Sequence, residues 1–292
     1  MNGQALTIRA IGCKAQAALE RSAGAFTPLH GFDDAPYVQA GGEIIWIGNS
    51  IAAMHPRAVL LERATRLAAG ERLQATALTP WRPAPLPSGA VTAAALRARC
   101  VALHFNLPRV GEPRGFAVML SGRAPDFPLD GAVILVQKLT NAFCRADADA
   151  ACDAAIPLLG LGPGLTPSGD DLVGAALFAR QAMAGSQADA VMWKNVAARV
   201  IGAAQTRSHA IGAALFRDLA SGESFAPLHR LAASLRCAAS DDLAIAATGD
   251  EQAIDAARAL VAIGHSSGWD MLAGFVLGVT GSVTPPQRRE TT

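Results

Sequence analysis

The first third of the chain combines short apolar runs with turn residues, a pattern typical of strands. Residues 6–11 and 43–48 are rich in β-branched side chains, and the second run follows Gly41-Gly42 and ends at Gly48-Asn49. Both runs are predicted strands, as is 115–120. In contrast, residues 57–73 have apolar positions at three- and four-residue spacing with Arg and Glu between them, which predicts an amphipathic helix.

The pattern changes twice along the chain. Four prolines between Pro80 and Pro87 predict an extended linker or surface loop over 79–89. From Asp130 onward Ala, Leu and Gly dominate, and helical periodicity predicts helices over 131–155, 167–184, 189–220, 226–239, 250–263 and 269–279. We therefore expect an α+β protein with a strand-containing part over 1–129, a mainly helical part over 130–281 and a loose tail over 282–292.

Composition and charge narrow the class of protein. Hydrophobic residues make up 51% of the chain and charged residues 17%, which excludes a disordered solvating chain. The net charge of +1 lacks the basic excess of a dedicated nucleic-acid binder. The apolar stretch 271–279 is too short to span a bilayer, which takes about 20 residues. Charges interrupt the first 26 residues, so no signal peptide is predicted and we expect a cytoplasmic protein.

The chain shows no familiar metal or nucleophile motif. Its five cysteines are odd in number and lie at least eight positions apart, which fits buried small side chains better than a disulfide framework or a zinc site. The sequence has no HExxH, GxSxG, Walker A or Rossmann pattern, and no metal site is predicted.

The most informative stretch is 160–171, which reads GLGPGLTPSGDD. Its alternating Gly and Pro predict a tight turn, and Thr166-Pro167 places a hydroxyl cap before a proline that suits the first helical position. Exposed N–H groups at such a helix start can bind a phosphate or carboxylate. The alternative is that the acids only complement the helix dipole and the glycines only allow close packing. The candidate ligand-binding residues are Gly162, Gly164, Thr166, Ser168, Gly169 and Asp170, with Asp171 as a candidate catalytic residue.

A second stretch, 264–274, reads GHSSGWDMLAG and repeats the design. Ser168, Gly169 and Asp171 recur at one constant offset of 99 as Ser267, Gly268 and Asp270. This repeat predicts two helix starts that face one another and share a site, in which an Asp from each helix holds an amide or amine of the ligand, or a Mg²⁺ that bridges to phosphate. Asp270 and His265 are candidate catalytic residues, the latter as a proton carrier, although a lone His is more often structural. Ser266, Ser267 and Gly268 are candidate ligand-binding residues.

A third candidate is Arg207, within Thr206-Arg207-Ser208-His209. Its guanidinium can pair with a carboxylate or phosphate, and the neighbouring hydroxyls can add hydrogen bonds. The alternative is a solvated turn, because Thr206 and Ser208 would not share a helix face.

The stretches 160–171 and 264–274 together resemble a bacterial family, formerly a domain of unknown function. Its members include AllH, the smallest of three subunits of oxamate carbamoyltransferase in allantoin degradation, a part of purine catabolism. The resemblance covers mainly residues 130–280. It implies carbamoyl transfer between oxalurate and phosphate, giving oxamate and carbamoyl phosphate, alongside two larger partner subunits.

The residues fit this chemistry, because glycine-rich helix starts offer donors to the charge that develops on carbonyl and phosphate oxygens. Two alternatives remain open. One is a non-catalytic interaction subunit, whose glycines serve helix packing. The other is a kinase-like or nucleotide-binding protein, in which Asp170 or Asp171 holds Mg²⁺.

Overall fold

The chain forms two units in the computed structural model, which describes residues 7–29, 37–62, 67, 71–73, 78–85, 93–182, 184–237 and 243–283. Unit 1 contains residues 1–84 and 224–226, and unit 2 contains residues 85–223 and 227–292. The units thus divide at residue 84, whereas the composition changes near residue 130. The predicted tail lies outside the described residues from 284 onward, as does the second half of the predicted linker from 86 to 89.

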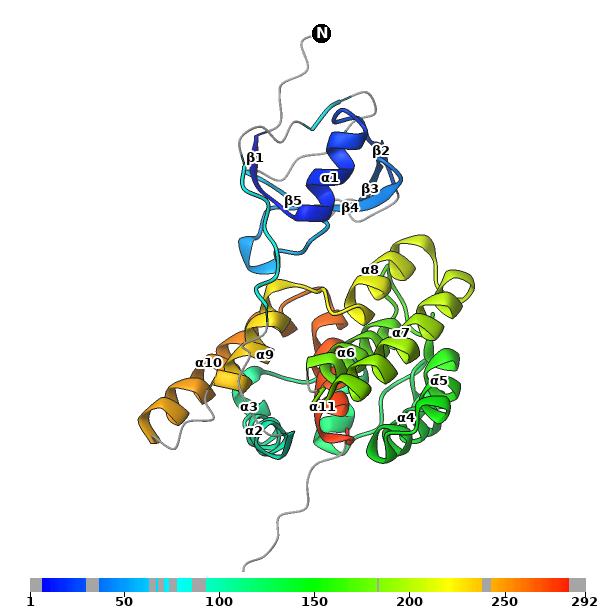
Figure 1. Cartoon of the computed structure of the whole chain (residues 1–292), viewed down its shortest axis with the longest axis vertical. Coiled ribbons are helices and arrows are strands. Elements are labelled where there is room, and N and C mark those ends of the chain that lie inside the picture. The colour runs from blue at the N-terminus through cyan, green and yellow to red at the C-terminus, as the bar shows by residue number, and fades with distance from the viewer. Residues whose placement is uncertain are drawn as a thin grey trace, which may run out of the picture. The chain divides into compact units, whose positions relative to one another are not determined.

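Unit 1 is a five-stranded sheet with one helix (Figure 1). The strand order is β1-β5-β4-β3-β2; β4 and β5 pair in parallel and the other neighbours are antiparallel. Helix α1 packs on this sheet, and Ile11, Ala15 and Leu19 are buried with the strand residues Val38 and Ile45. The elements are β1 Ile8–Ile11, α1 Cys13–Arg21, β2 Thr27–Pro28, β3 Tyr37–Ala40, β4 Glu43–Gly48, the 3₁₀ turn η1 Ile51–Ala53 and β5 Ala58–Leu61.

The prediction of a helix over 57–73 is wrong at its start, where the chain forms β5. All four residues of β5 are buried between β1 and β4. A continuous apolar run such as Ala-Val-Leu-Leu fits a buried strand as well as a buried helix, so periodicity alone does not separate the two. Residues 63–66 and 68–70 of the predicted helix lie outside the described residues.

A short segment from late in the chain completes unit 1. The ring of Phe225 lies 4.7 Å from that of His55 and 6.2 Å from that of Trp46, measured between centroids. The N–H of Ala226 donates to the Met54 carbonyl at 2.7 Å. Residues 224–226 therefore belong to the sheet unit although the chain before and after them is helical.

The regular elements described in unit 2 are all helices. Together with the sheet of unit 1, they confirm the α+β class. Two of its helices, α2 and α3, lie in a region for which the sequence pattern predicts no element. The elements are α2 Ala93–Phe105, α3 Leu107–Val110, η2 Gly115–Ser121, η3 Asp130–Ala132, α4 Val133–Arg145, α5 Ala148–Ala155, η4 Ile156–Leu158, α6 Ser168–Ala182, α7 Gln187–Arg207, α8 Ala210–Ala220, α9 Ala226–Cys237, α10 Leu243–Val261 and α11 Ser267–Thr280.

Three predicted elements of unit 2 differ in the structure. The predicted strand over 115–120 is the 3₁₀ helix η2, which begins at Gly115 with a φ of +56°. The predicted helix 131–155 breaks at Ala146, with a φ of +51°, and restarts at α5 behind an Asp147 cap. The predicted helix 189–220 breaks at Ser208, and His209 caps α8. In both breaks a polar side chain competes for the backbone donors of the next turn.

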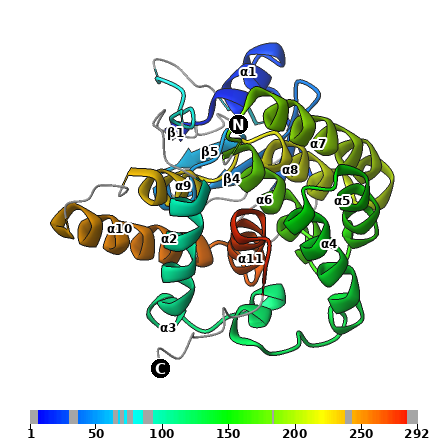
Figure 2. The ribbon, with the colours of Figure 1, turned by 60° about the horizontal axis from the view of Figure 1, so that its bottom comes forward.

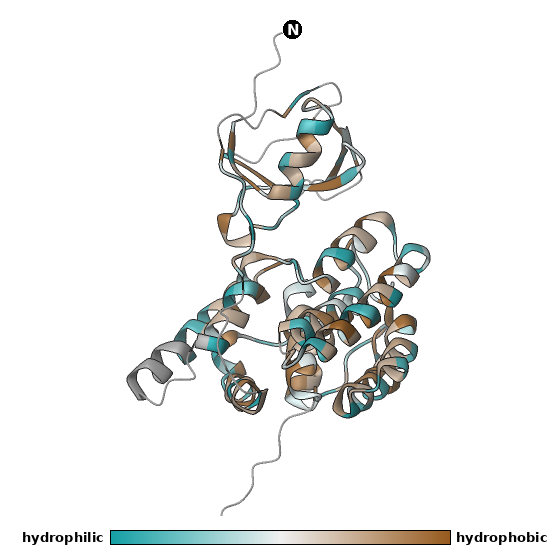
Figure 3. Cartoon of the chain, viewed as in Figure 1, coloured by the Kyte–Doolittle hydropathy of each residue, from teal (hydrophilic) through white to brown (hydrophobic). Residues whose placement is uncertain are grey.

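Helices α6 and α11 form the centre of unit 2. Helix α11 packs against α6, α10, α2, α4 and η2, and Figure 2 shows it between α2 and α10 on one side and α6 and α4 on the other. In Figure 3, hydrophilic residues recur along the outer helices of unit 2. Gly274 of α11 lies against the Leu172 carbonyl, and Gly278 lies against the Ala176 carbonyl. The contacts advance in the same direction along both helices, so α6 and α11 are parallel and their N-termini lie at one end.

Candidate functional site

The two predicted helix starts lie side by side, as the repeated sequence pattern predicts. The Thr166 and Ser267 hydroxyls form a hydrogen bond of 2.6 Å. The Ser168 and Ser266 hydroxyls lie 3.5 Å apart. Four hydroxyl groups from two segments about 100 residues apart in sequence therefore form one cluster.

The two starts also share their backbone geometry. The N–H of Gly169 donates to the Leu161 carbonyl at 2.9 Å, and the N–H of Gly268 donates to the Ile263 carbonyl at 3.0 Å. A Cβ on Gly169 would collide with the Leu158 carbonyl, and a Cβ on Gly268 would collide with the Leu260 carbonyl. Each of these carbonyls lies three residues before the acceptor. Glycine is thus required at both positions by the close approach of the preceding chain.

The loops that lead into the helices differ by three residues. Gly162 and Gly264 both have a positive φ, +105° and +64°, and a Cβ on either would crowd the serine that begins its helix. These two glycines are 102 positions apart, whereas the helix residues repeat at 99. The three extra residues lie in the first loop, which contains Gly164. Gly164 has a φ of +95°, and no atom of the described residues lies close to the position that a Cβ would take.

Asp171 and Asp270 lie in the first turns of the two helices and are buried, with 7% and 0% of their surfaces exposed. Burial raises the pKa of Asp270 to about 7, against the opposing hydrogen bonds from Ser168, the Phe116 N–H and Ser266. Burial also raises the pKa of Asp171 well above its ordinary value, and the nearby Asp270 raises it further. Ser267 and Thr166 donate to Asp171 and oppose this rise. Each carboxyl group is thus hydrogen-bonded by the serine of the other helix start.

Each of these two carboxyl groups keeps one buried oxygen without a hydrogen-bond partner. The Phe116 N–H donates to Oδ1 of Asp270 at 2.7 Å, while Oδ2 of Asp270 and Oδ2 of Asp171 have none. Buried polar atoms are nearly always paired in folded proteins, and an unpaired one costs about 1–3 kcal/mol. These two oxygens are therefore positioned to accept hydrogen bonds from a bound molecule or to carry a proton.

Asp170 has a different environment. Its Oδ1 accepts from the Gly160 N–H at 2.8 Å and its Oδ2 accepts from the Ser208 hydroxyl at 2.5 Å. Burial raises its pKa, and these hydrogen bonds oppose the rise. Asp170 thereby ties the beginning of the glycine-rich loop to the turn between α7 and α8.

The third candidate segment lies at this turn. Arg207 is the last residue of α7 and is exposed, and its carbonyl lies against Gly160. His209 accepts from the Gly212 N–H at Nδ1, while its Nε2 lies 3.3 Å from the Gly164 carbonyl. The segment therefore contacts the glycine-rich loop, but the contacts come from Ser208, His209 and the Arg207 backbone rather than from the Arg207 guanidinium.

His265 is exposed at the second helix start and contacts a residue that sequence reasoning missed. The Arg114 guanidinium lies 3.3 Å from Nδ1 of His265 and donates to the His265 carbonyl at 3.4 Å. Gly115 and Phe116, which follow Arg114, contact the Asp270 carboxyl group. No local sequence signal identifies Arg114 or the Phe116 N–H, because their roles depend on a contact 151 and 154 residues away in sequence.

Within the described residues, no group of three or more His, Cys, Asp or Glu side chains is arranged to hold a metal ion. The same part of the chain has no helix that is long and apolar enough to span a membrane.

The fold and the site define the class: an α+β protein whose helical unit is built on two equivalent, glycine-marked helix starts that bring two carboxyl groups together. Residues 158–279, which include both starts, match the family described as oxamate carbamoyltransferase subunit AllH. This part of the chain is similar to that family. Neither the comparison with curated proteins nor that with solved structures finds a significant match.

Proposed function

We propose that this chain is the subunit of a carbamoyltransferase complex that binds the carbamoyl-bearing ligand, and that the ligand lies at the paired starts of α6 and α11. The complex would interconvert oxalurate and phosphate with oxamate and carbamoyl phosphate. The observation that carries the proposal is the pair of buried oxygens, Oδ2 of Asp171 and Oδ2 of Asp270, that lack partners. A carbamoyl NH₂ group offers donors to an orphaned carboxylate oxygen, and a protonated carboxyl group can donate to the ligand.

The reaction requires a proton at a defined place. A phosphate oxygen attacks the carbamoyl carbon, the bond from that carbon to the oxamate nitrogen breaks, and the nitrogen takes up a proton as oxamate leaves. Asp270, with a pKa of about 7, suits a group that gives this proton in one direction and receives it in the other. Asp171 would hold the carbamoyl NH₂, and the exposed His265 is a second candidate proton carrier.

Two parallel helix starts also suit an anionic ligand. Their dipoles place partial positive charge at one end of the pair, which stabilises charge on the carbonyl and phosphate oxygens. The four clustered hydroxyls of Thr166, Ser168, Ser266 and Ser267 would add hydrogen bonds. The loop that contains Gly162 and Gly164 is open at the Cβ position of Gly164, which would allow close approach to the backbone. Gly169, Gly268, Asp170 and Arg207 complete the proposed binding residues, with Asp170 acting through the loop that it anchors.

The proposed complex contains two larger subunits in the cytoplasm, with no nucleic acid or membrane as partner. The match to a family of subunits supports the presence of partners. The reaction would then be measured only with the partners present, whereas ligand binding to this chain can be measured alone.

The second candidate function is that of a non-catalytic interaction subunit. It is favoured by the close contacts of Gly274 and Gly278 with α6, which show that glycine serves helix packing in the same pair of helices. Under this alternative the carboxyl groups would be only part of the packed core.

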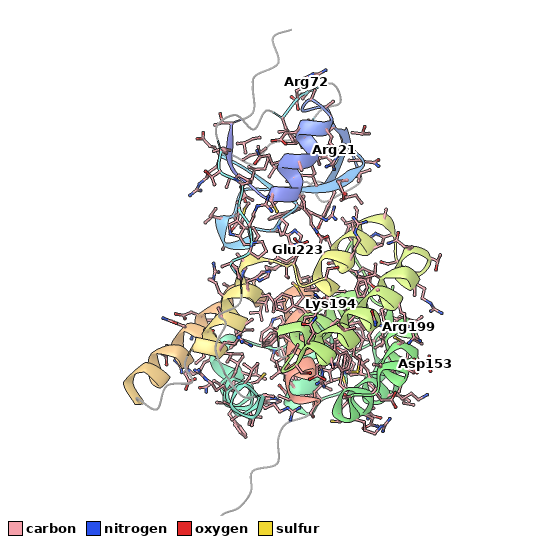
Figure 4. The ribbon with its side chains drawn as sticks, viewed as in Figure 1. Arg21, Arg72, Asp153, Lys194, Arg199 and Glu223 are labelled. Atoms are coloured by element: carbon pink, nitrogen blue, oxygen red, sulfur yellow. The ribbon has the colours of Figure 1, made fainter. Side chains whose placement is uncertain are left out.

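Substitution of the carboxyl groups separates the two functions. In the complex reconstituted with both partners, Asp171→Asn and Asp270→Asn should each lower turnover about 100-fold or more while leaving the fold intact, as loss of one positioned polar group in an active site does. Asp153→Asn is the matched control, because Asp153 is exposed on α5 (Figure 4). Wild-type turnover in both site variants would reject the catalytic role and leave the packing role standing.

A further inference from the structure

Arg114 is an arginine without an acidic partner at the edge of the proposed site. Among the residues that the structure describes, some exposed arginines of unit 2 pair with acids, such as Arg109 with Glu251 at 2.8 Å and Arg199 with Asp149 at 2.6 Å. No described carboxylate pairs with Arg114, and its guanidinium contacts only the ring nitrogen and the carbonyl of His265. Within the described part of the chain, the positive charge of Arg114 therefore has no acidic partner.

The backbone after Arg114 is fixed against the carboxyl pair. Gly115 has a φ of +56°, which favours glycine, and a Cβ there would collide with the Asp270 carboxyl group. The next N–H, that of Phe116, donates to Oδ1 of Asp270 at 2.7 Å. The chain can thus carry Arg114 beside Asp270 only because residue 115 has no side chain.

The guanidinium of Arg114 is held by His265. The guanidinium lies 3.3 Å from Nδ1 of His265 and donates to the His265 carbonyl at 3.4 Å. His265 lies in the loop that leads into α11, five positions before Asp270. Arg114 therefore joins the loop before α11 to the carboxyl group in its first turn.

We propose that Arg114 binds the anionic end of the ligand whose carbamoyl end meets Asp171 and Asp270. This inference rests on the proposed function and specifies its substrate class: a short molecule with a carbamoyl amide at one end and a carboxylate or phosphate at the other. A guanidinium pairs with both anions through two parallel hydrogen bonds, and no described acid competes for it. Oxalurate and carbamoyl phosphate both have this arrangement of groups.

Charge selectivity provides a test that does not depend on turnover. The full chain is titrated with oxalurate and with oxaluramide, in which a neutral amide replaces the carboxylate. The wild type should bind oxalurate about 10- to 100-fold more tightly, since a hydrogen bond to a charged group contributes about 1.5–3 kcal/mol. Arg114→Gln should lose this preference and bind both compounds with similar affinity, while Arg114→Lys should keep part of it.

Two further variants locate the effect. Arg199→Gln removes an exposed arginine on α7 (Figure 4) that takes no part in the site, and it should behave as the wild type. Arg207→Gln tests the rival arginine at the end of α7, and this variant would lose the preference for oxalurate in place of Arg114→Gln if Arg207 held the anionic end of the ligand. Circular dichroism of each variant checks that the fold is intact.

The outcomes distinguish this inference from the function on which it rests. If the wild type binds neither compound, the proposed function fails together with the inference. If the wild type prefers oxalurate and Arg114→Gln keeps the full preference, or if Arg207→Gln alone abolishes it, the role of Arg114 is overturned while the proposed site stands. Equal affinity of the wild type for both compounds would likewise overturn it.

Discussion

Replacement of Asp270 by asparagine isolates the energetic cost of a buried carboxylate at the start of α11. Asparagine keeps the shape of the side chain and an oxygen that can accept from the Phe116 N–H, but it does not ionise. Its NH₂ group would take the place of Oδ2, which has no partner in the wild type either. The main difference between the two proteins is therefore the negative charge.

The magnitude follows from the pKa. Burial raises the pKa of Asp270 from the ordinary 3.8 to about 7. A tenfold change in proton affinity corresponds to about 1.4 kcal/mol, so the folded state favours the protonated form by about 4 kcal/mol. Between these two pKa values the folded state binds more protons than the unfolded state, and the stability of the wild type falls as pH rises.

The assay is urea unfolding followed by helical circular dichroism at pH 5 and pH 8. Relative to the wild type, Asp270→Asn should gain about 3 kcal/mol in free energy of unfolding between the two pH values, because the wild type must give up its proton over most of this range. Removal of the neighbouring charge should also lower the pKa of Asp171, which acts in the same direction. Asp153→Asn should show a difference below about 0.5 kcal/mol at both pH values. A difference between Asp270→Asn and wild type that does not change with pH would refute the reasoning.

Two other predictions concern packing and thiol accessibility. Gly268→Ala should lower the free energy of unfolding by about 2 kcal/mol or more, because its Cβ would collide with a loop carbonyl, whereas Gly202→Ala, with open space at its Cβ position, should raise it slightly; urea unfolding measures both. A thiol reagent should modify the exposed Cys144 rapidly and Cys100 only on unfolding, because Cys100 is buried and burial raises its pKa to about 12; faster modification of Cys100 in the native protein would contradict the packing of α2.

Local chemistry explains which helix starts could be predicted from the sequence. The starts of α6 and α11 follow from residues that act within their own turn, namely the glycines with a positive φ that precede each helix. Helix α6 begins at Ser168, one residue after the predicted first position Pro167, and the Thr166 hydroxyl bonds to Ser267. The constant offset between Ser168 and Ser267 then predicts that the two helix starts lie together, because a local pattern that occurs twice is explained if both copies contribute to one site.

Long-range contacts explain what the sequence did not predict. The run Ala58–Leu61 becomes a strand only because β1 and β4 flank it, and a buried apolar run has no period of its own. The segment that begins at Gly115 becomes a 3₁₀ helix where Phe116 donates to Asp270, a residue 154 positions away. Arg114 has its place in the candidate site for the same reason, so no pattern within its own segment could indicate it.

The parallel orientation of α6 and α11 has a consequence for how the protein folds. Two consecutive helices can pack antiparallel through a short turn, but a parallel pair needs the chain to travel back along its own length, and here α7 to α10 make that return. The Thr166 and Ser267 hydroxyls are 101 positions apart, and closing a loop of this length costs about 4 kcal/mol in chain entropy. Neither helix start gains its partner until that loop has closed, so the carboxyl pair requires the whole chain between them, and a fragment that contains only one of the two starts has half of the cluster.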